Sequence, residues 1–268
     1  MDICKLNDDS SGYAQRFNGI ARLYGVEGMA KIRVAHVCVV GIGGVGSWAV
    51  EALARSGIGA ITMVDMDEVC ISNVNRQLPA MDGEIGKAKI EVMGARVKAI
   101  HPECRIDLQH RFFSESSAAQ ILSQPYDFVL DAIDSRRHKC LLIALCKRKG
   151  LPIITVGGAG GRRDPSKIEI VDLSKTRDDP LLQQVRKRLR TEYGFTRNHR
   201  RKFGVPCVYS KEMPVYPQTD GSVCATRAPG EEGGLRLDCD QGYGSATFVT
   251  GAFGFAASAH IVQKIAES

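Results

Sequence analysis

A glycine-rich loop between an expected strand and an expected helix constrains this chain more than any other feature. One apolar run ends at Val40 and leads into the loop, and a second apolar run ends at Asp65. Glycines at this spacing permit a tight turn and a close approach of the backbone to phosphate oxygens, while the amides of the following helix face those oxygens. We predict a nucleotide-binding β-α-β unit whose phosphate cradle is formed by Gly41, Gly43, Gly44 and Gly46.

Apolar runs and amphipathic segments alternate along the first 160 residues. We expect strands at 35–40, 60–65, 105–110, 127–131 and 152–156, with helices at 45–56, 87–100 and 137–149. This alternation predicts parallel strands joined by right-handed crossovers. The expected fold class is therefore α/β, with a doubly wound, mostly parallel, Rossmann-like sheet whose connections reverse at the glycine loop.

The second half of the chain is less regular. We expect a strand at 168–173, a helix at 181–193, a strand at 207–216, a long loop at 218–245 and an apolar helix at 246–266. The whole chain is interpreted as one domain of 268 residues. It would comprise N-terminal helices at 1–34, a nucleotide-binding core at 35–160, and a half at 161–268 that faces the substrate and the partner subunit.

Acidic side chains should gather where the expected parallel strands end. Asp65 is placed to accept hydrogen bonds from a ribose, and Asp67 is the nearby alternative. Asp134 follows the fourth expected strand and would reach the same edge of the sheet. A carboxylate there is suited to hold the Mg²⁺ of a nucleotide.

Basic and amide side chains are expected at that edge too. Asn73 and Arg76 follow the second strand, and Lys89 lies in the first turn of the next helix. Cations that face a triphosphate are needed to activate a carboxylate by adenylylation. A nicotinamide-linked dehydrogenase has no use for them. We therefore expect ATP and Mg²⁺ as cofactors, with Arg76, Lys89 and Asp134 in catalysis.

The positive charge of the chain is concentrated in one segment. The net charge is +6, and residues 180–204 hold eight Lys or Arg against one acidic residue, which leaves 28 basic and 29 acidic residues elsewhere. A local basic block favours a polyanionic partner. Residues 186–202 are our candidate contact, and a solvated helix face is the alternative.

The cysteines and the N-terminus bear on the compartment. The N-terminus lacks a basic segment followed by an apolar stretch, so we expect no signal peptide. Nine cysteines are then interpreted as reduced thiols in the cytoplasm. Cys38, Cys70, Cys140 and Cys146 are expected to be buried. The apolar helix at 246–266 leaves membrane association as the alternative, although we favour a core or interface helix.

Five motifs together resemble a known family. They are G-I-G-G-V-G-S at 41–47, V-D-M-D at 64–67, N-x-N-R-Q at 73–77, G-K-A-K at 86–89 and D-A-I-D at 131–134. They are similar to the motifs of the E1-like (ubiquitin-activating-enzyme-like, ThiF/MoeB-type) adenylyltransferases. The resemblance implies that Asp65, Asn73, Arg76, Lys89 and Asp134 bind ATP and its magnesium. It also implies a homodimer whose nucleotide sites lie near a two-fold interface.

Further motifs resemble one branch of that family. They are R-F-x-G-x-A-R-L-Y-G at 16–25, G-G-A-G-G at 157–161 and V-Y-P-Q-x-D-G-S-V-C at 215–224. Members of this branch dehydrate N6-threonylcarbamoyladenosine at position 37 of tRNA. The resemblance implies that the threonyl carboxylate attacks the α-phosphate of ATP, and that the adjacent ureido group then displaces AMP to close a ring. The basic block at 186–202 would suit tRNA phosphates.

The resemblance also raises two questions about catalytic residues. Some members supply an arginine from the partner subunit; Gly19 stands where we place that residue, and Arg16 is our candidate in its stead. Cys239 or Cys224 would be the thiol of an acyl-thioester or a sulfur acceptor. However, the acidic neighbours of Cys239 disfavour a thiolate, and an intramolecular cyclisation needs no nucleophilic cysteine.

Other functions remain open at this point. The rival enzyme is an adenylyltransferase that activates the C-terminal glycine of a sulfur-carrier protein, with a cysteine desulfurase as partner. Many such enzymes carry two Cys-x-x-Cys pairs that hold a structural zinc, and this sequence has none. A non-catalytic nucleotide-sensing or RNA-binding module is a third possibility.

Overall fold

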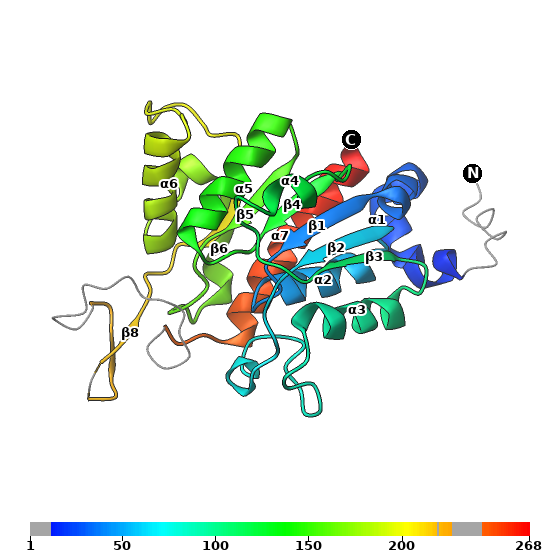
Figure 1. The fold of residues 1–268 in the computed structure, drawn as a ribbon, viewed down its shortest axis with the longest axis horizontal. Coiled ribbons are helices and arrows are strands. Elements are labelled where there is room, and N and C mark those ends of the chain that lie inside the picture. The colour runs from blue at the N-terminus through cyan, green and yellow to red at the C-terminus, as the bar shows by residue number, and fades with distance from the viewer. Residues whose placement is uncertain (1–11, 219, 227–242) are drawn as a thin grey trace.

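A seven-stranded sheet, with strand order β3-β2-β1-β4-β5-β7-β6, runs through the protein (Figure 1). The computed structural model describes residues 12–218, 220–226 and 243–268. The strands are β1 (His36–Val40), β2 (Ala60–Val64), β3 (Arg105–Gln109), β4 (Phe128–Asp131), β5 (Ile153–Val156), β6 (Ile168–Asp172) and β7 (Pro206–Ser210). All neighbours are parallel except β6, which is antiparallel to β7. The predicted doubly wound, mostly parallel sheet is confirmed, and its connections reverse at β1.

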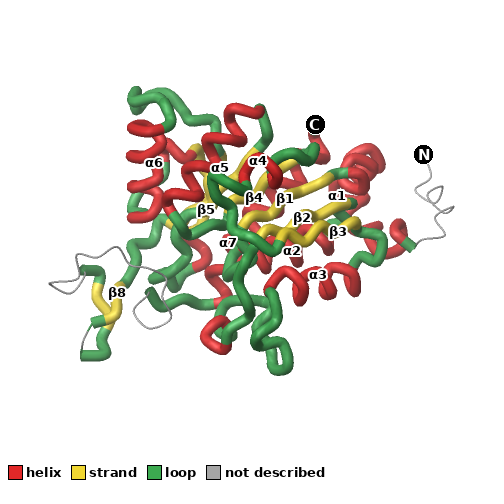
Figure 2. The backbone as a smooth tube through the Cα atoms, viewed as in Figure 1, coloured by secondary structure: helices red, strands yellow, loops and turns green. Residues whose placement is uncertain are grey.

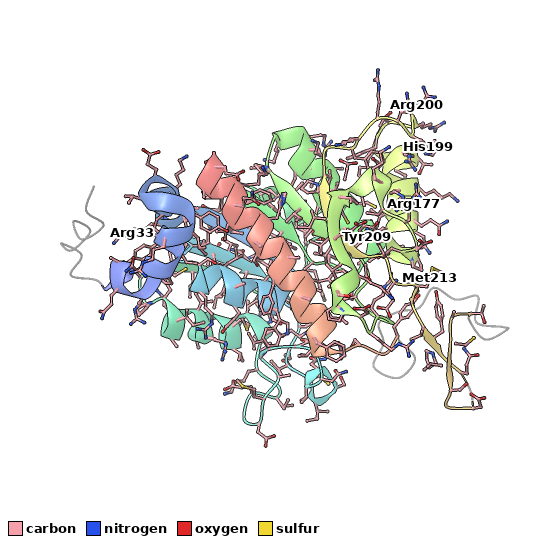
Figure 3. The ribbon with its side chains drawn as sticks, turned by 180° about the vertical axis from the view of Figure 1, so that it is seen from behind. Arg33, Arg177, His199, Arg200, Tyr209 and Met213 are labelled. Atoms are coloured by element: carbon pink, nitrogen blue, oxygen red, sulfur yellow. The ribbon has the colours of Figure 1, made fainter. Side chains whose placement is uncertain are left out.

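Helices cover both faces of the sheet. On one face lie α1 (Tyr13–Val34), α2 (Gly46–Arg55), α3 (Lys89–Ile100) and α7 (Thr247–Glu267); on the other lie α4 (Ala118–Ile121), α5 (Arg136–Lys149) and α6 (Pro180–Glu192) (Figures 1 and 3). Along β1, Val37 and Val39 enter the first core while Cys38 and Val40 enter the second. Burial on both faces explains why the inner strands β1, β2, β4 and β5 are nearly continuous apolar runs, whereas β3 and β6 are partly exposed and carry charged residues.

The apolar helix α7 packs along α2. A Cβ atom on Gly254 would lie 2.7 Å from the carbonyl oxygen of Val45, so the two helices touch at backbone distance. The Ser258 hydroxyl donates to the Ala49 carbonyl at 3.1 Å. These contacts make α7 a core helix, as predicted. In the described part of the chain, no helix has the length and apolar character that crossing a membrane requires.

Two sequence-based predictions were wrong. The strand expected at 207–216 ends at Ser210, because the chain leaves the sheet and the amide of Val215 donates to the Gly161 carbonyl at 2.9 Å. Residues Tyr216–Pro217 instead form β8, which pairs with β9 (Val223–Cys224). Cys70 is exposed, since it precedes the short 3-10 turn η2 (Ile71–Asn73) in the loop after β2. Two further 3-10 turns of the same length, η3 (Pro165–Lys167) and η4 (Leu173–Lys175), flank β6.

Candidate nucleotide-binding site

The glycine loop follows β1 at the carboxyl edge of the sheet, where the loops after β2 and β4 also gather (Figure 2). Gly41 has φ 93°, and a Cβ atom there would lie 2.7 Å from the Ala132 carbonyl oxygen. A Cβ on Gly46 would overlap the carbonyl oxygen of Gly41. Gly43, by contrast, has open space around it, with one atom at 4.0 Å. Gly41 and Gly46 therefore shape the turn, while Gly43 leaves room for a ligand.

Ser47 connects this loop to the segment after β2. Its hydroxyl donates to the Gly43 carbonyl at 2.7 Å and accepts from the Leu78 amide at 3.2 Å. A Cβ on Gly44 would lie 3.2 Å from the Thr250 methyl group of α7. The cradle is consequently fixed by three separate parts of the chain.

Asp65 ties the end of β2 to the glycine loop. Its Oδ2 atom accepts from the Ile42 amide at 2.6 Å, and its Oδ1 atom accepts from the Asp67 amide at 2.8 Å. Burial raises the pKa of the Asp65 carboxyl, against the opposing effect of these two hydrogen bonds. The carboxylate lies beside the phosphate cradle, where the ribose of a nucleotide would be expected.

Lys89 and Asp67 form an ion pair at the same edge. The Lys89 ammonium lies 2.9 Å from Asp67 Oδ2, and the Lys89 amide donates to the Asp67 carbonyl at 3.0 Å. Lys89 is buried, whereas Asp67 is exposed. Asp67 thus holds the cation at the start of α3, and a bound phosphate would compete with it.

The main chain of Arg76 is fixed from two helices. Its carbonyl accepts from the indole N–H of Trp48 at 3.1 Å and from the Thr250 hydroxyl at 3.2 Å. Its guanidinium donates to the Ser72 carbonyl at 2.7 Å and to Asn75 Oδ1 at 3.0 Å. Neither Trp48 nor Thr250 was predicted as a site residue, because no motif marks them. They fix the position of a cation that the sequence did predict.

Asn73 is buried and serves the turn that carries Arg76. Its Oδ1 atom accepts from the Cys70 amide at 3.1 Å, and its own carbonyl accepts from the amides of Arg76 and Gln77. In this structure Asn73 therefore stabilises the loop.

Asp134 is exposed beyond β4, and its carboxylate forms no hydrogen bond or ion pair with any residue that the structure describes. Three residues earlier, Asp131 is fully buried and receives hydrogen bonds from Lys139 Nζ at 2.8 Å and Thr155 Oγ1 at 2.6 Å. This buried pair fixes the start of the Asp134 loop. Magnesium binds through one or two carboxylates together with phosphate oxygens, so an accessible carboxylate at this edge fits the ion.

Arg16 lies away from these residues within the same chain. Its Nη1 atom donates to the Ile100 carbonyl at 3.4 Å, at the end of α3, and it lines a cavity of about 470 Å³ with Arg55 and Arg96. Lys89 begins the same helix, and a twelve-residue helix is about 18 Å long. Arg16 therefore cannot reach the phosphate cradle of its own chain.

The basic block at 186–202 is divided in the structure. Arg188 pairs with Glu192, Arg190 donates to the Thr196 carbonyl, and Arg186 donates to Thr176. The exposed members are Lys187, Arg197, Arg200, Arg201 and Lys202. All of these except Lys187 lie after the C-terminal end of α6. Figure 3 labels Arg200 at that end, well away from Met213.

The structure describes only one of the two candidate thiols. Cys239 lies outside the described residues. Cys224 is exposed in β9, and a hydrogen bond between its sulfur and the Thr226 hydroxyl, at 3.3 Å, lowers the pKa of the thiol.

Comparison with known proteins gives close relatives over almost the whole chain. The tRNA threonylcarbamoyladenosine dehydratase of Escherichia coli is 51% identical over 256 residues, which cover 96% of this chain and 95% of that protein. The enzyme of the same name from Haemophilus influenzae is 50% identical over 254 residues, which cover 94% of this chain and 94% of that protein. A solved structure of E. coli tRNA N6-threonylcarbamoyladenosine dehydratase in complex with ATP matches with a TM-score of 0.85 and 46% identity, over 96% of both chains. Residues 15–266 match the ThiF family, and the chain belongs to that family.

Proposed function

We propose that this protein is an ATP-dependent dehydratase that converts N6-threonylcarbamoyladenosine in tRNA to its cyclic form. The observation that carries this proposal is the similarity to dehydratases of that name over nearly the whole chain, one of them solved with ATP. The phosphate cradle and the neighbouring cations of this chain support the use of ATP.

Each predicted residue has a role in this proposal. The amides of the glycine loop and the cations of Arg76 and Lys89 face the phosphates, and Asp65 accepts hydrogen bonds from the ribose. Asp134 holds Mg²⁺, which neutralises phosphate charge when it is bound. Asp67 releases Lys89 to the nucleotide, and Asn73 keeps the loop of Arg76 in place.

The reaction has two steps. A carboxylate oxygen of the threonyl group attacks the α-phosphorus, and pyrophosphate leaves with the electron pair of the broken P–O bond. The oxygen of the ureido group then attacks the activated acyl carbon. AMP leaves with the electron pair of the acyl C–O bond, and the ureido nitrogen loses its proton as the ring closes. Together these steps remove one water from the nucleoside, and no cysteine takes part.

We place the tRNA on the half of the chain from residue 161 onward, with its phosphates against the exposed members of the basic block. The exposed basic residues at 197–202 lie at the opposite end of α6 from the nucleotide-binding edge of the sheet. The tRNA would therefore extend across the molecule. The proposal includes a cytoplasmic homodimer in which Arg16 reaches the partner's nucleotide site. No sulfur-transfer partner is required.

A direct test supplies ATP together with tRNA that carries the modified nucleoside. The expected product is a nucleoside lighter by one water, with AMP and pyrophosphate formed in equal amounts. Asp134→Ala and Arg76→Ala should abolish turnover without loss of the folded state. Pyrophosphate exchange that depended only on a glycine-tailed carrier protein would refute the proposal.

A mixing experiment tests the role of Arg16. Arg16→Ala and Arg76→Ala should each be inactive alone. If Arg16 acts across the interface, a mixed dimer contains one complete site, and about a quarter of wild-type activity returns after random exchange of equal amounts. No recovery after verified exchange would remove Arg16 from the site.

A further inference from the structure

Arg162 is a buried arginine whose hydrogen bonds are incomplete. It is 2% exposed, its Nη2 atom donates to the Asp178 carbonyl at 3.3 Å, and the same atom lies 3.7 Å from Asp179 Oδ2. Its Nε and Nη1 atoms have no hydrogen-bond partner among the described residues. A buried donor without an acceptor is costly, so an acceptor supplied by a bound ligand would be favourable here.

The surroundings of Arg162 are built by the second glycine-rich segment. Gly157–Gly161 follows β5, and a Cβ on Gly157 would overlap the carboxylate of Asp179. That carboxylate accepts from the Gly158 amide at 2.9 Å and from the Leu182 amide at 2.9 Å, so it also caps α6. The end of β5 and the start of α6 thus hold Arg162 in a fixed position.

Two aromatic rings lie beside this arginine. The rings of Tyr216 and Tyr243 are 5.2 Å apart, and both residues are partly exposed. A Cβ on Gly161 would lie 2.9 Å from the Tyr243 ring, which places that ring directly on the loop before Arg162. The amide of Val215, the residue before Tyr216, donates to the Gly161 carbonyl at 2.9 Å, so Tyr216 also lies beside this loop. Aromatic faces of this kind stack on the unpaired bases of RNA.

The same segment connects Arg162 to the nucleotide site. The Gly161 amide donates to the Gly244 carbonyl at 2.7 Å, and Asn75 Nδ2 donates to the Ser245 carbonyl at 2.8 Å. Asn75 is the neighbour of Arg76 in sequence. Gly244 and Ser245 therefore connect the loop that carries Arg162 to the loop that carries Arg76.

We propose that Arg162 binds the carboxylate of the threonyl group, and that Tyr216 and Tyr243 stack against the modified adenine base. The proposal rests on the function proposed above. It assigns the open donors of a buried guanidinium to the one anionic group that distinguishes this nucleoside from adenosine. Adenylylation removes the charge of that carboxylate, so Arg162 would hold the substrate more tightly than the acyl-adenylate.

The test compares the binding of two tRNAs without ATP. One carries N6-threonylcarbamoyladenosine, and the other carries its uncharged methyl ester. Wild-type protein should bind the acid about 10- to 100-fold more tightly, the range of a charge-assisted hydrogen bond. In Arg162→Gln this ratio should fall to near one, while ATP affinity stays unchanged.

A second variant keeps the proposal testable if Arg162→Gln does not fold. Tyr216→Ala should weaken the binding of both tRNAs equally and leave the ratio between acid and ester intact. Equal binding of acid and ester by the wild-type protein would overturn the proposal, as would a retained preference in folded Arg162→Gln. Lack of turnover by wild-type protein on modified tRNA would instead refute the dehydratase function itself.

Discussion

The buried pair of Asp131 and Lys139 allows a quantitative prediction. Both side chains are 0% exposed, and they meet at 2.8 Å. Lys139→Met removes the cation and leaves a buried carboxylate that still accepts from Thr155 Oγ1 and from the Ile133 amide. Removing one partner of a buried pair costs about 3–5 kcal/mol. Because two hydrogen bonds to Asp131 remain, we expect the free energy of unfolding to fall by about 3 kcal/mol, the lower end of that range.

A double variant isolates the cause of that loss. Asp131→Asn added to Lys139→Met leaves neither residue charged. The amide Oδ1 atom can still accept from the Ile133 amide, and Nδ2 can donate to Thr155 Oγ1. It should recover most of the lost free energy of unfolding, to within about 1 kcal/mol of wild type. Urea denaturation, followed by circular dichroism and by the fluorescence of Trp48, measures both variants. A double variant no more stable than Lys139→Met would refute the reasoning, because the loss would then come from packing.

Three further predictions concern the cradle, pH and tRNA. Gly46→Ala should destabilise the fold and abolish ATP binding, because its Cβ would overlap the Gly41 carbonyl, whereas Gly43→Ala should fold normally and lose ATP affinity alone. Burial lowers the pKa of His101 below 6.5, so the unfolded chain binds more protons and the free energy of unfolding should fall as pH drops through about 6.5. His101→Phe should reduce that slope in denaturation at several pH values, and an unchanged slope would contradict the assignment. Arg200→Ala combined with Arg201→Ala should reduce the slope of log K for tRNA binding against log salt concentration by about 0.7–0.9 for each lost phosphate contact. Filter binding at several salt concentrations measures this slope. Equal slopes for the variant and the wild type would exclude residues 197–202 from the tRNA interface.

Much of the fold could be predicted from the sequence because its strands are short apolar runs that alternate with amphipathic helices. The carboxyl ends of parallel strands meet at the same edge of a sheet, and this rule predicts that Gly46 and Asp65 lie close together. The long strand expected at 207–216 was wrong because apolar residues return at Met213 and Val215, after Lys211 and Glu212, although the backbone has already left the sheet to meet Gly161. Periodicity carries no information about such a departure.

The candidate site was predictable only in part, for a related reason. Lys89 and Arg76 belong to short motifs, so their chemistry was visible locally. Trp48 and Thr250, which fix Arg76, come from helices far apart in sequence, and Arg162 is distinguished only by its burial and its open donors. Residues that act through tertiary contacts leave no spacing to recognise.

The contact between α2 and α7 has a consequence for the synthesis of the protein. Ser258 and Ala49 are hydrogen-bonded across 209 residues, and Thr250 touches both the phosphate cradle and the loop of Arg76. At about 5–20 residues per second, a ribosome needs roughly 10–40 s to make the second helix after the first. During that interval the glycine loop lacks one wall, so a nascent chain should not retain ATP until α7 has left the exit tunnel. Nucleotide binding would thus report the completion of folding.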